Sequence, residues 1–222
     1  MKLESYWAEA WSILGLAAPA GALDALLRSY QEPHRHYHNL QHLTECFQQF
    51  ERLRADCEYP AEILLAIWFH DAIYDTRAHD NEARSAVWAV NVLLDGGAAF
   101  NTIARVEALI LATRHDSAPT TPDQCVLLDI DLGILGASTT RFAEYEQQIR
   151  AEYAWVPEAE FIEARRRVVH GMLQRARLYH LPTATMRERA AKRNLKTSLD
   201  QLDVQLARQR ALQAPPATRQ AH

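Results

Sequence analysis

Apolar residues recur along most of the chain at the spacing of helices that bury one face. No segment shows a sustained two-residue alternation rich in β-branched residues, and only seven of the 222 residues are glycine. The pattern predicts an all-α protein. Its expected helices cover residues 2–15, 19–31, 39–55, 60–72, 81–95, 101–114, 122–136, 139–154, 157–179 and 184–209.

Several of these helices have recognisable end signals. Pro157 suits a first helical position, and the acids that follow it precede a run of arginines, as the helix dipole favours. Gly96 and Gly97 are expected to close the helix before them, and Thr120 or Thr121 can cap the helix at 122.

We expect one helical domain over residues 1–210, with a core at about 30–180 and a basic C-terminal helix at about 184–209. Residues 211–222 are predicted to form a disordered tail.

Composition narrows the class of protein. The net charge of −4 provides no global basic field that would attract nucleic acid, so we do not expect a nucleic-acid partner. The three scattered cysteines (Cys46, Cys57 and Cys125) suit a reducing compartment better than a disulfide framework. The N-terminal segment has no signal-peptide core, and no apolar stretch approaches the roughly 20 residues that span a bilayer. We therefore expect a cytoplasmic protein that does not enter a membrane.

The first candidate chemistry follows the apolar run 63–69, which has no polar face and should be buried. It ends in His70 and Asp71. Burying an imidazole and a carboxylate without partners is strongly unfavourable. A metal ion resolves the conflict, because it binds both groups together.

Two other segments offer further ligands. His38 and His42 are four residues apart where the 39–55 helix begins, and Leu40 and Leu43 anchor that helix to the core. A lone histidine is ordinarily a surface cap or a satisfied core residue. The presence of the His70–Asp71 pair favours the interpretation that His42 is a metal ligand.

Two carboxylates, Asp129 and Asp131, interrupt another apolar helical run. Residues two apart on a helix differ by about 200° in direction, so the two are not expected to face the same ion. One is predicted to be a ligand, and the other a cap, a support for a ligand or an ion-pair partner. The alternative for the pair is a buried salt bridge with an arginine.

Four of these residues follow one another along the chain as His42, His70, Asp71 and Asp131. In this order and on helices, they resemble the H…HD…D signature of the HD superfamily of metal-dependent phosphohydrolases. The words around them, over residues 30–200, look like a bacterial subgroup of predicted HD phosphohydrolases: Tyr37-His38-Asn39-Leu40-Gln41-His42, His70-Asp71-Ala72-Ile73-Tyr74-Asp75 and Asp129-Ile130-Asp131-Leu132-Gly133. The resemblance implies an HD helical bundle with a divalent ion between its helices. It also implies that His42, His70, Asp71 and Asp131 bind the ion, with Asp131 favoured over Asp129.

The implied activity is hydrolysis of a small, nucleotide-like phosphomonoester or phosphodiester. The ion would polarise a phosphoryl oxygen and lower the pKa of a bound water. Mixed N/O ligation suits Mn²⁺, Fe²⁺, Co²⁺, Ni²⁺, Zn²⁺ or Mg²⁺. The alternatives are a non-catalytic HD module that binds a nucleotide or metal, and an HD oxygenase, which needs more ligands. The sequence also allows the chain to form a homodimer.

Catalytic roles rest on a second resemblance. The word from Tyr37 to His42 resembles an element of cyclic-nucleotide phosphodiesterases, which implies that His38 is a general acid and His42 a ligand. Asp71 and Glu82 complete the expected catalytic set, since Glu82 and Ser85 share a helical face and could orient water. The alternative for Glu82 is an ordinary first-turn acid.

Substrate contacts are expected from His115 and Arg193. His115 follows an apolar helix and could bind phosphate or a second metal, or could simply be a favourable C-terminal cation; His79 is more simply structural. Arg193 lies on the basic last helix, which could attract an anionic substrate or RNA. Such a helix face is more often merely solvated.

Overall fold

The computed structural model describes residues 2–213, and within this part of the chain it contains helices and no strand. The all-α prediction is therefore confirmed. The helices are α1 (Leu3–Leu14), α2 (Ala22–Ser29), α3 (Leu40–Leu53), α4 (Pro60–Phe69), α5 (Asn81–Asp95), α6 (Phe100–Ala112), α7 (Pro122–Asp131), α8 (Thr139–Glu152), α9 (Glu158–Gln174) and α10 (Thr185–Gln213). Short 3₁₀ turns cover Arg54–Asp56, Leu132–Gly136 and Pro182–Ala184.

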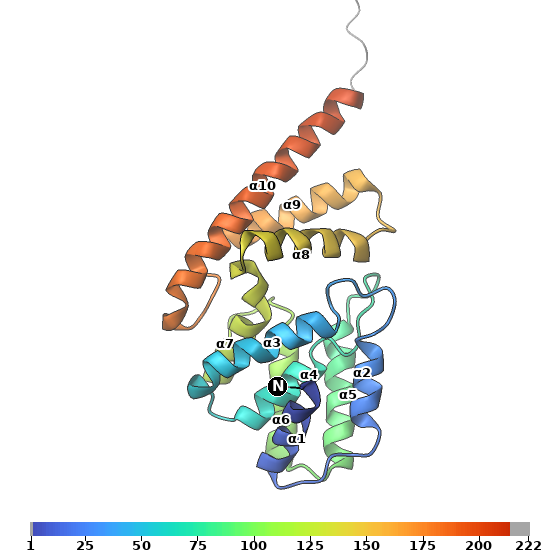
Figure 1. Cartoon of the computed structure of the whole chain (residues 1–222), viewed down its shortest axis with the longest axis vertical. Helices are drawn as coiled ribbons and strands as arrows, with labels where there is room; N and C mark the ends of the chain where they lie inside the picture. Colours follow the sequence, from blue (N-terminus) through green and yellow to red (C-terminus); the bar gives the residue numbers. More distant parts are fainter. Residues whose placement is uncertain (1, 214–222) are drawn as a thin grey trace, which may run out of the picture.

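The helices form two layers, which Figure 1 shows one above the other. The first layer comprises α1–α7, and α4 lies at its centre against α1, α3, α5, α6 and α7. Every residue from Ala61 to Phe69 is buried, as expected for a helix without a polar face.

The second layer comprises α8–α10 and lies across one end of the first. Its own core joins Phe142 and Tyr145 of α8 to apolar residues of α9 and α10. Tyr37 and the turn at 132–136 also belong to this core, so the segments that precede α3 and follow α7 connect the layers. The far end of α10 projects beyond its neighbours (Figure 1).

Helices α3–α8 begin within one residue of their predicted starts. Thr121 is the residue that caps α7, because its hydroxyl accepts the Gln124 N–H at 3.2 Å. Pro157 precedes the first turn of α9 instead of occupying it. The predicted ends of the helices are less accurate: α4 stops at Phe69 and α7 at Asp131, where a 3₁₀ turn continues the chain.

The prediction that residues 175–179 continue α9 is wrong. The backbone N–H groups of Leu178 and Tyr179 are accepted by the Glu188 carboxylate, and those of His180 and Leu181 by Asp129. Carboxylates from two other segments therefore satisfy this backbone without helical bonds.

The last helix is longer than predicted and includes residues 211–213, which were expected in the tail. The remainder of that predicted tail, 214–222, lies outside the described residues. Within residues 2–213, no helix is both long and apolar enough to cross a membrane.

Candidate metal centre

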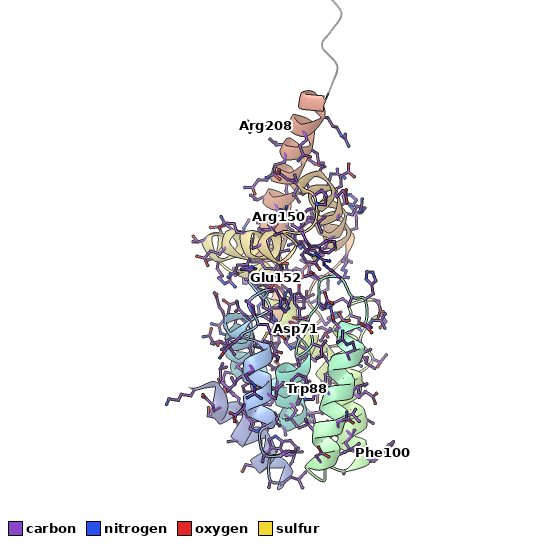
Figure 2. The ribbon with its side chains drawn as sticks, turned by 90° about the vertical axis from the view of Figure 1, so that its right-hand side faces the viewer. Asp71, Trp88, Phe100, Arg150, Glu152 and Arg208 are labelled. Atoms are coloured by element: carbon purple, nitrogen blue, oxygen red, sulfur yellow. The ribbon has the colours of Figure 1, made fainter. Side chains whose placement is uncertain are left out.

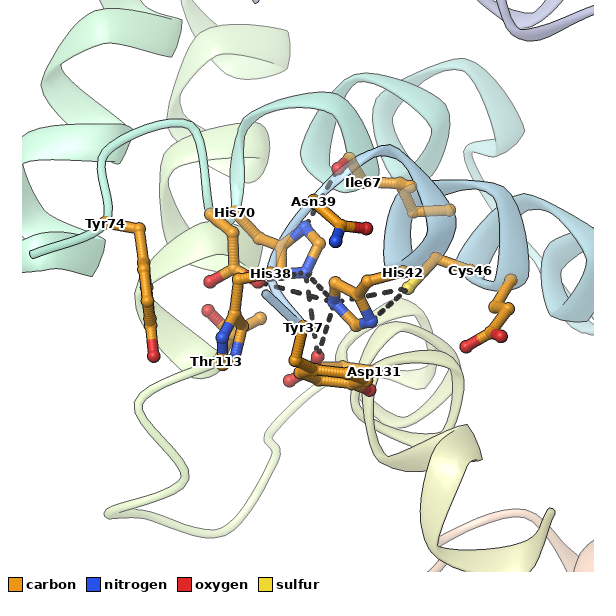
Figure 3. A network of polar contacts seen from close by, with 12 residues as sticks. Tyr37, His38, Asn39, His42, Cys46, Ile67, His70, Tyr74, Thr113 and Asp131 are labelled. Atoms are coloured by element: carbon orange, nitrogen blue, oxygen red, sulfur yellow. Dashed lines mark hydrogen bonds and ion pairs between the residues drawn. The ribbon is translucent and has the colours of Figure 1, made fainter. Parts of the chain in front are cut away.

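Three segments distant in the sequence bring four ligand-type side chains together (Figure 3). His42 lies in the first turn of α3, and His70 and Asp71 directly follow the buried helix α4. Asp131 is the last residue of α7. One ligand atom from each residue lies within 4.8 Å of all the others, so the group could hold a metal ion.

The two imidazoles face each other, with 3.1 Å between the Nε2 atoms of His42 and His70. An oxygen of Asp71 lies 3.3 Å from the first Nε2 and 3.1 Å from the second. An oxygen of Asp131 lies 3.6 Å from both. Two nitrogens and two carboxylate oxygens thus surround one point, a donor set that suits a divalent transition metal.

The tautomer of His70 is fixed by its second nitrogen. Nδ1 lies 2.9 Å from the carbonyl oxygen of Ile67, which can only accept, so Nδ1 carries the proton. In the neutral ring this leaves the Nε2 lone pair free and directed at the other three residues. Metal-binding histidines are commonly oriented in this way.

A buried thiol adjoins the group. The Sγ atom of Cys46 lies 3.6–3.8 Å from the ring nitrogens of His42, and His42, Cys46 and His70 form a second possible metal-binding set. In Figure 3 the sulfur lies beside the His42 ring, away from Asp131. The set with two carboxylates offers four donors and the thiol set only three.

Electrostatics favour charged carboxylates in the centre. Burial alone disfavours their ionised forms, but the histidines outweigh it and hold the pKa of Asp71 and of Asp131 well below the ordinary value. Burial likewise opposes the imidazolium form of His70, yet Asp71 and Asp131 raise its pKa well above the ordinary value. The negative charge of the two carboxylates thus favours protonation of His70, and a bound cation would balance the same charge.

His38 lies beside this group, in the segment before α3 and not on the helix itself. Its Nδ1 bonds the Glu152 carboxylate at 2.8 Å, and its ring stacks on Tyr74 with 4.1 Å between centroids. Burial lowers the pKa of His38, but Asp71 and Glu152 outweigh it and raise the pKa above the ordinary value. His38 also lines the cavity beside Asp71 and Asp131.

Glu152 is the main residue that sequence analysis missed. One oxygen accepts the backbone N–H groups of His36, Tyr37 and His38 at 2.7–2.9 Å. The other accepts the Tyr74 hydroxyl at 2.9 Å, besides its bond to His38. In Figure 2, Glu152 lies at the junction of the two layers, directly above Asp71. Nothing in the sequence distinguishes it from other helical acids.

Arg35, also missed, supports the backbone beside the centre. Its buried guanidinium donates to the carbonyl oxygens of Asp71 at 2.6 Å and Ala72 at 2.9 Å. It therefore holds the backbone of a candidate ligand. An arginine in a polar segment before a helix is ordinarily exposed, so the sequence carries no signal of this role.

His115 reaches the centre through Asp131, whose second oxygen lies 2.8 Å from His115 Nε2. Its φ of 57° lies in the left-handed region, which is unusual for a residue other than glycine. The carbonyl oxygen of His115 accepts a hydrogen bond from Arg175 at 3.3 Å. Strained backbone of this kind is concentrated at functional sites.

A cavity of about 200 Å³ lies against two of the four candidate ligands, Asp71 and Asp131. Among the predicted residues, His38, Asp71, Glu82, His115 and Asp131 line it. Tyr37 lines it too, and its buried hydroxyl has no hydrogen-bond partner among the described residues. Such an atom requires a water or a ligand.

Three residues singled out from the sequence, besides Arg193, lie outside the centre or bond the backbone of other segments. Asp129 is buried, and its carboxylate accepts the backbone N–H groups of His180 and Leu181, so it holds a distant segment of the chain. Ser85 bonds the backbone of Ile73 at 3.0 Å. His79 is exposed and outside the cavity.

Arg193 is exposed on α10 and does not line the cavity, whereas its neighbour Asn194 is buried and bonds the carbonyl oxygen of Leu135 at 2.8 Å. The structure therefore does not bring Arg193 to the centre.

No protein-family model matches the chain, and comparisons with curated proteins and with solved structures gave no significant match. The resemblance to the HD superfamily thus depends on the residues and on their arrangement.

Proposed function

We propose that the chain is an HD-type, metal-dependent phosphohydrolase that acts on a small, nucleotide-like phosphomonoester or phosphodiester. The observation that carries the proposal is the convergence of His42, His70, Asp71 and Asp131 from three separate segments. Their order in the sequence is that of the HD signature.

The donor set fits a divalent metal ion. The Nε2 atoms of His42 and His70 lie at hydrogen-bond distance, and the Ile67 carbonyl leaves the His70 Nε2 without a proton in the neutral ring. The two carboxylates supply negative charge that the histidines only partly balance. When bound, the ion supplies Lewis-acid activation of the phosphoryl group and of a water molecule.

The protein's own groups would perform the proton transfer and the positioning. His38 donates a proton to the leaving oxygen, and Glu152 fixes the ring by accepting its Nδ1–H. Glu152 also holds the backbone on which His38 lies. The unpaired Tyr37 hydroxyl is a donor for a phosphoryl oxygen inside the cavity.

The size of the cavity suits a phosphate group more than a whole nucleotide. Its volume of about 200 Å³ is below the range of roughly 300–1,000 Å³ typical of drug-sized ligands. We infer that the phosphate enters the cavity and that most of the ester lies outside it. Both His115 and Glu82 line the cavity wall, where His115 would contact the phosphate and Glu82 would orient water.

The test is hydrolysis of p-nitrophenyl phosphate and of a panel of nucleotides, with Mn²⁺, Co²⁺, Ni²⁺, Zn²⁺, Fe²⁺ or Mg²⁺ added in turn. Activity should disappear with chelator and return with metal. Asp131→Asn should abolish it, whereas Asp129→Asn, which removes a charge two residues away, should retain a measurable fraction.

Activity that survives both chelator and Asp131→Asn would come from a contaminant. Tight nucleotide binding without turnover on the whole panel would indicate a binding module instead of an enzyme.

A further inference from the structure

A second hollow, of about 850 Å³, lies on the other side of Tyr74 from the cavity of the metal centre. Tyr74 is the residue that lines both. The walls come from α2, the segments before α3 and after α4, α5 and the end of α8. The hollow is therefore separate from the four candidate ligands.

The acidic residues that line this second hollow are already engaged. Glu32 bonds Arg35 at 2.9 Å, and Asp75 accepts the backbone N–H of Arg77 at 2.9 Å. Glu152 is fully buried and accepts five hydrogen bonds. Glu32 offsets Arg35, and Glu152 is enclosed by its donors. Asp75 thus remains the exposed acid of this lining without an ion pair among residues 2–213.

Of the four arginines in the same walls, Arg35 alone forms a close ion pair among the described residues. Arg28 and Arg77 are exposed and form no ion pair within residues 2–213. Arg84 pairs only with Asp80, at 3.9 Å, which is a weak surface contact. Three exposed arginines thus line one hollow in a protein of net charge −4.

An aromatic side chain adjoins these arginines. Trp155 is 48% exposed, and its indole N–H donates to the Thr76 hydroxyl at 2.8 Å. The Arg77 guanidinium lies over the indole, 4.7 Å from the ring centroid. A stacked guanidinium keeps its N–H groups available to an anion, and the hydrogen bond holds the ring in place.

We propose that this hollow is a second ligand site that binds a nucleotide. Arg28, Arg77 and Arg84 hold its phosphate groups, because guanidinium groups bind phosphate through paired, charge-assisted hydrogen bonds. The exposed part of the Trp155 indole provides an apolar contact for its base. The bound nucleotide is not in contact with the metal ligands, so it is not the molecule that reacts.

The test is binding of α,β-methylene-ADP, a nucleoside diphosphate analogue with a hydrolysis-resistant bridge, to the intact protein. Calorimetry should show saturable binding, and Trp155 should report it as a change in fluorescence. The Arg28→Ala/Arg77→Ala double variant should weaken binding by at least about tenfold, because it removes two of the three arginines that hold the phosphates.

Matched controls separate this site from the metal centre. Arg52→Ala removes an exposed arginine outside the hollow and should leave binding unchanged. Asp131→Asn should also leave it unchanged. Trp155→Phe should bind with a smaller fluorescence change. Pyrophosphate should compete and adenosine alone should compete poorly, because the arginines recognise the phosphates.

Absence of binding at millimolar analogue would overturn the inference. So would binding that Asp131→Asn removes and the double arginine variant does not, because the ligand would then occupy the metal centre. The assay measures no turnover, so its outcome is independent of the proposed phosphohydrolase activity.

Discussion

Single residues decide what the centre can bind, and the hydrogen bond from His70 to Ile67 is the clearest case. It assigns the His70 proton to Nδ1 and directs Nε2 toward His42 and the two carboxylates. The Asp129/Asp131 pair is a second case in which the direction of a single side chain decides its role. Asp131 faces the centre, while Asp129, about 200° away around the helix, bonds the 180–181 backbone.

The first prediction at this scale concerns metal content. The purified protein should hold about one divalent ion per chain, and His70→Ala or Asp71→Ala should largely lose it, because each removes one of four donors. Cys46→Ser should retain it, since the sulfur lies away from Asp131. Elemental analysis measures this directly. Full occupancy in both ligand variants, or loss of metal in Cys46→Ser, would show that the donor set is assigned wrongly.

The second prediction separates acid from ligand. His38→Ala should lower kcat by about 10²- to 10⁴-fold, the usual range for a positioned acid, with little change in metal content. His42→Ala should lose the metal as well as the activity. Steady-state kinetics and elemental analysis on the two variants provide the comparison. The opposite result, with metal lost only from His38→Ala, would reverse the two roles.

At the scale of elements, helix α8 completes a site whose candidate ligands all belong to the first layer. Its last residue, Glu152, reaches the segment before α3 and accepts five hydrogen bonds there. The same carboxylate thus positions His38 and connects the two layers. Burial raises its pKa, but His38 and the backbone donors lower it to about 2, from 4.5.

The third prediction follows from this lowered pKa. A carboxyl group whose folded pKa is depressed stabilises the fold above its unfolded pKa and loses that contribution as the pH falls. Glu152→Gln should therefore be less stable than the wild type near pH 6, by roughly 3 kcal/mol. The difference should shrink below pH 4.5 and largely vanish near pH 2. Urea unfolding in the presence of chelator measures it.

Glu163→Gln is the matched control, because Glu163 is exposed on α9 and forms no ion pair among residues 2–213. It should change stability little at any pH. A stability difference for Glu152→Gln that is constant from pH 6 to pH 2 would show that the carboxylate charge is not what stabilises this junction.

At the scale of the whole molecule, the candidate ion would connect α3, the end of α4 and the end of α7. A ligand that binds only the folded state stabilises it by RT ln(1 + [L]/Kd), about 2.7 kcal/mol at a hundred times Kd. Without the ion, negative charge from Asp71 and Asp131 remains concentrated among these segments.

The fourth prediction is that chelator lowers the melting temperature of the wild type and that added metal restores it in a concentration-dependent way. Asp131→Asn should melt at a temperature that chelator does not change. Differential scanning calorimetry on both proteins tests this. A wild-type melting temperature that is insensitive to chelator, in protein shown to contain the ion, would contradict a bridging role.

The sequence by itself determined what depends on local pattern. Helix starts followed from apolar spacing and from capping residues such as Thr121, whose partner lies three residues away. The burial of α4 followed from its lack of any polar face. The candidate ligands followed as well, because a carboxylate or imidazole in an apolar run needs a partner wherever the chain places it.

Only the tertiary structure decided what depends on distant partners. α9 ends at Gln174 because Glu188 and Asp129 satisfy the backbone beyond it. Glu152 became part of the site because α8 packs across the first layer, and Arg193 did not because it faces solvent on α10. Hydrogen bonds between segments about 50 to 115 residues apart leave no periodic trace in the sequence, so the fold must bring their partners together before their roles are defined.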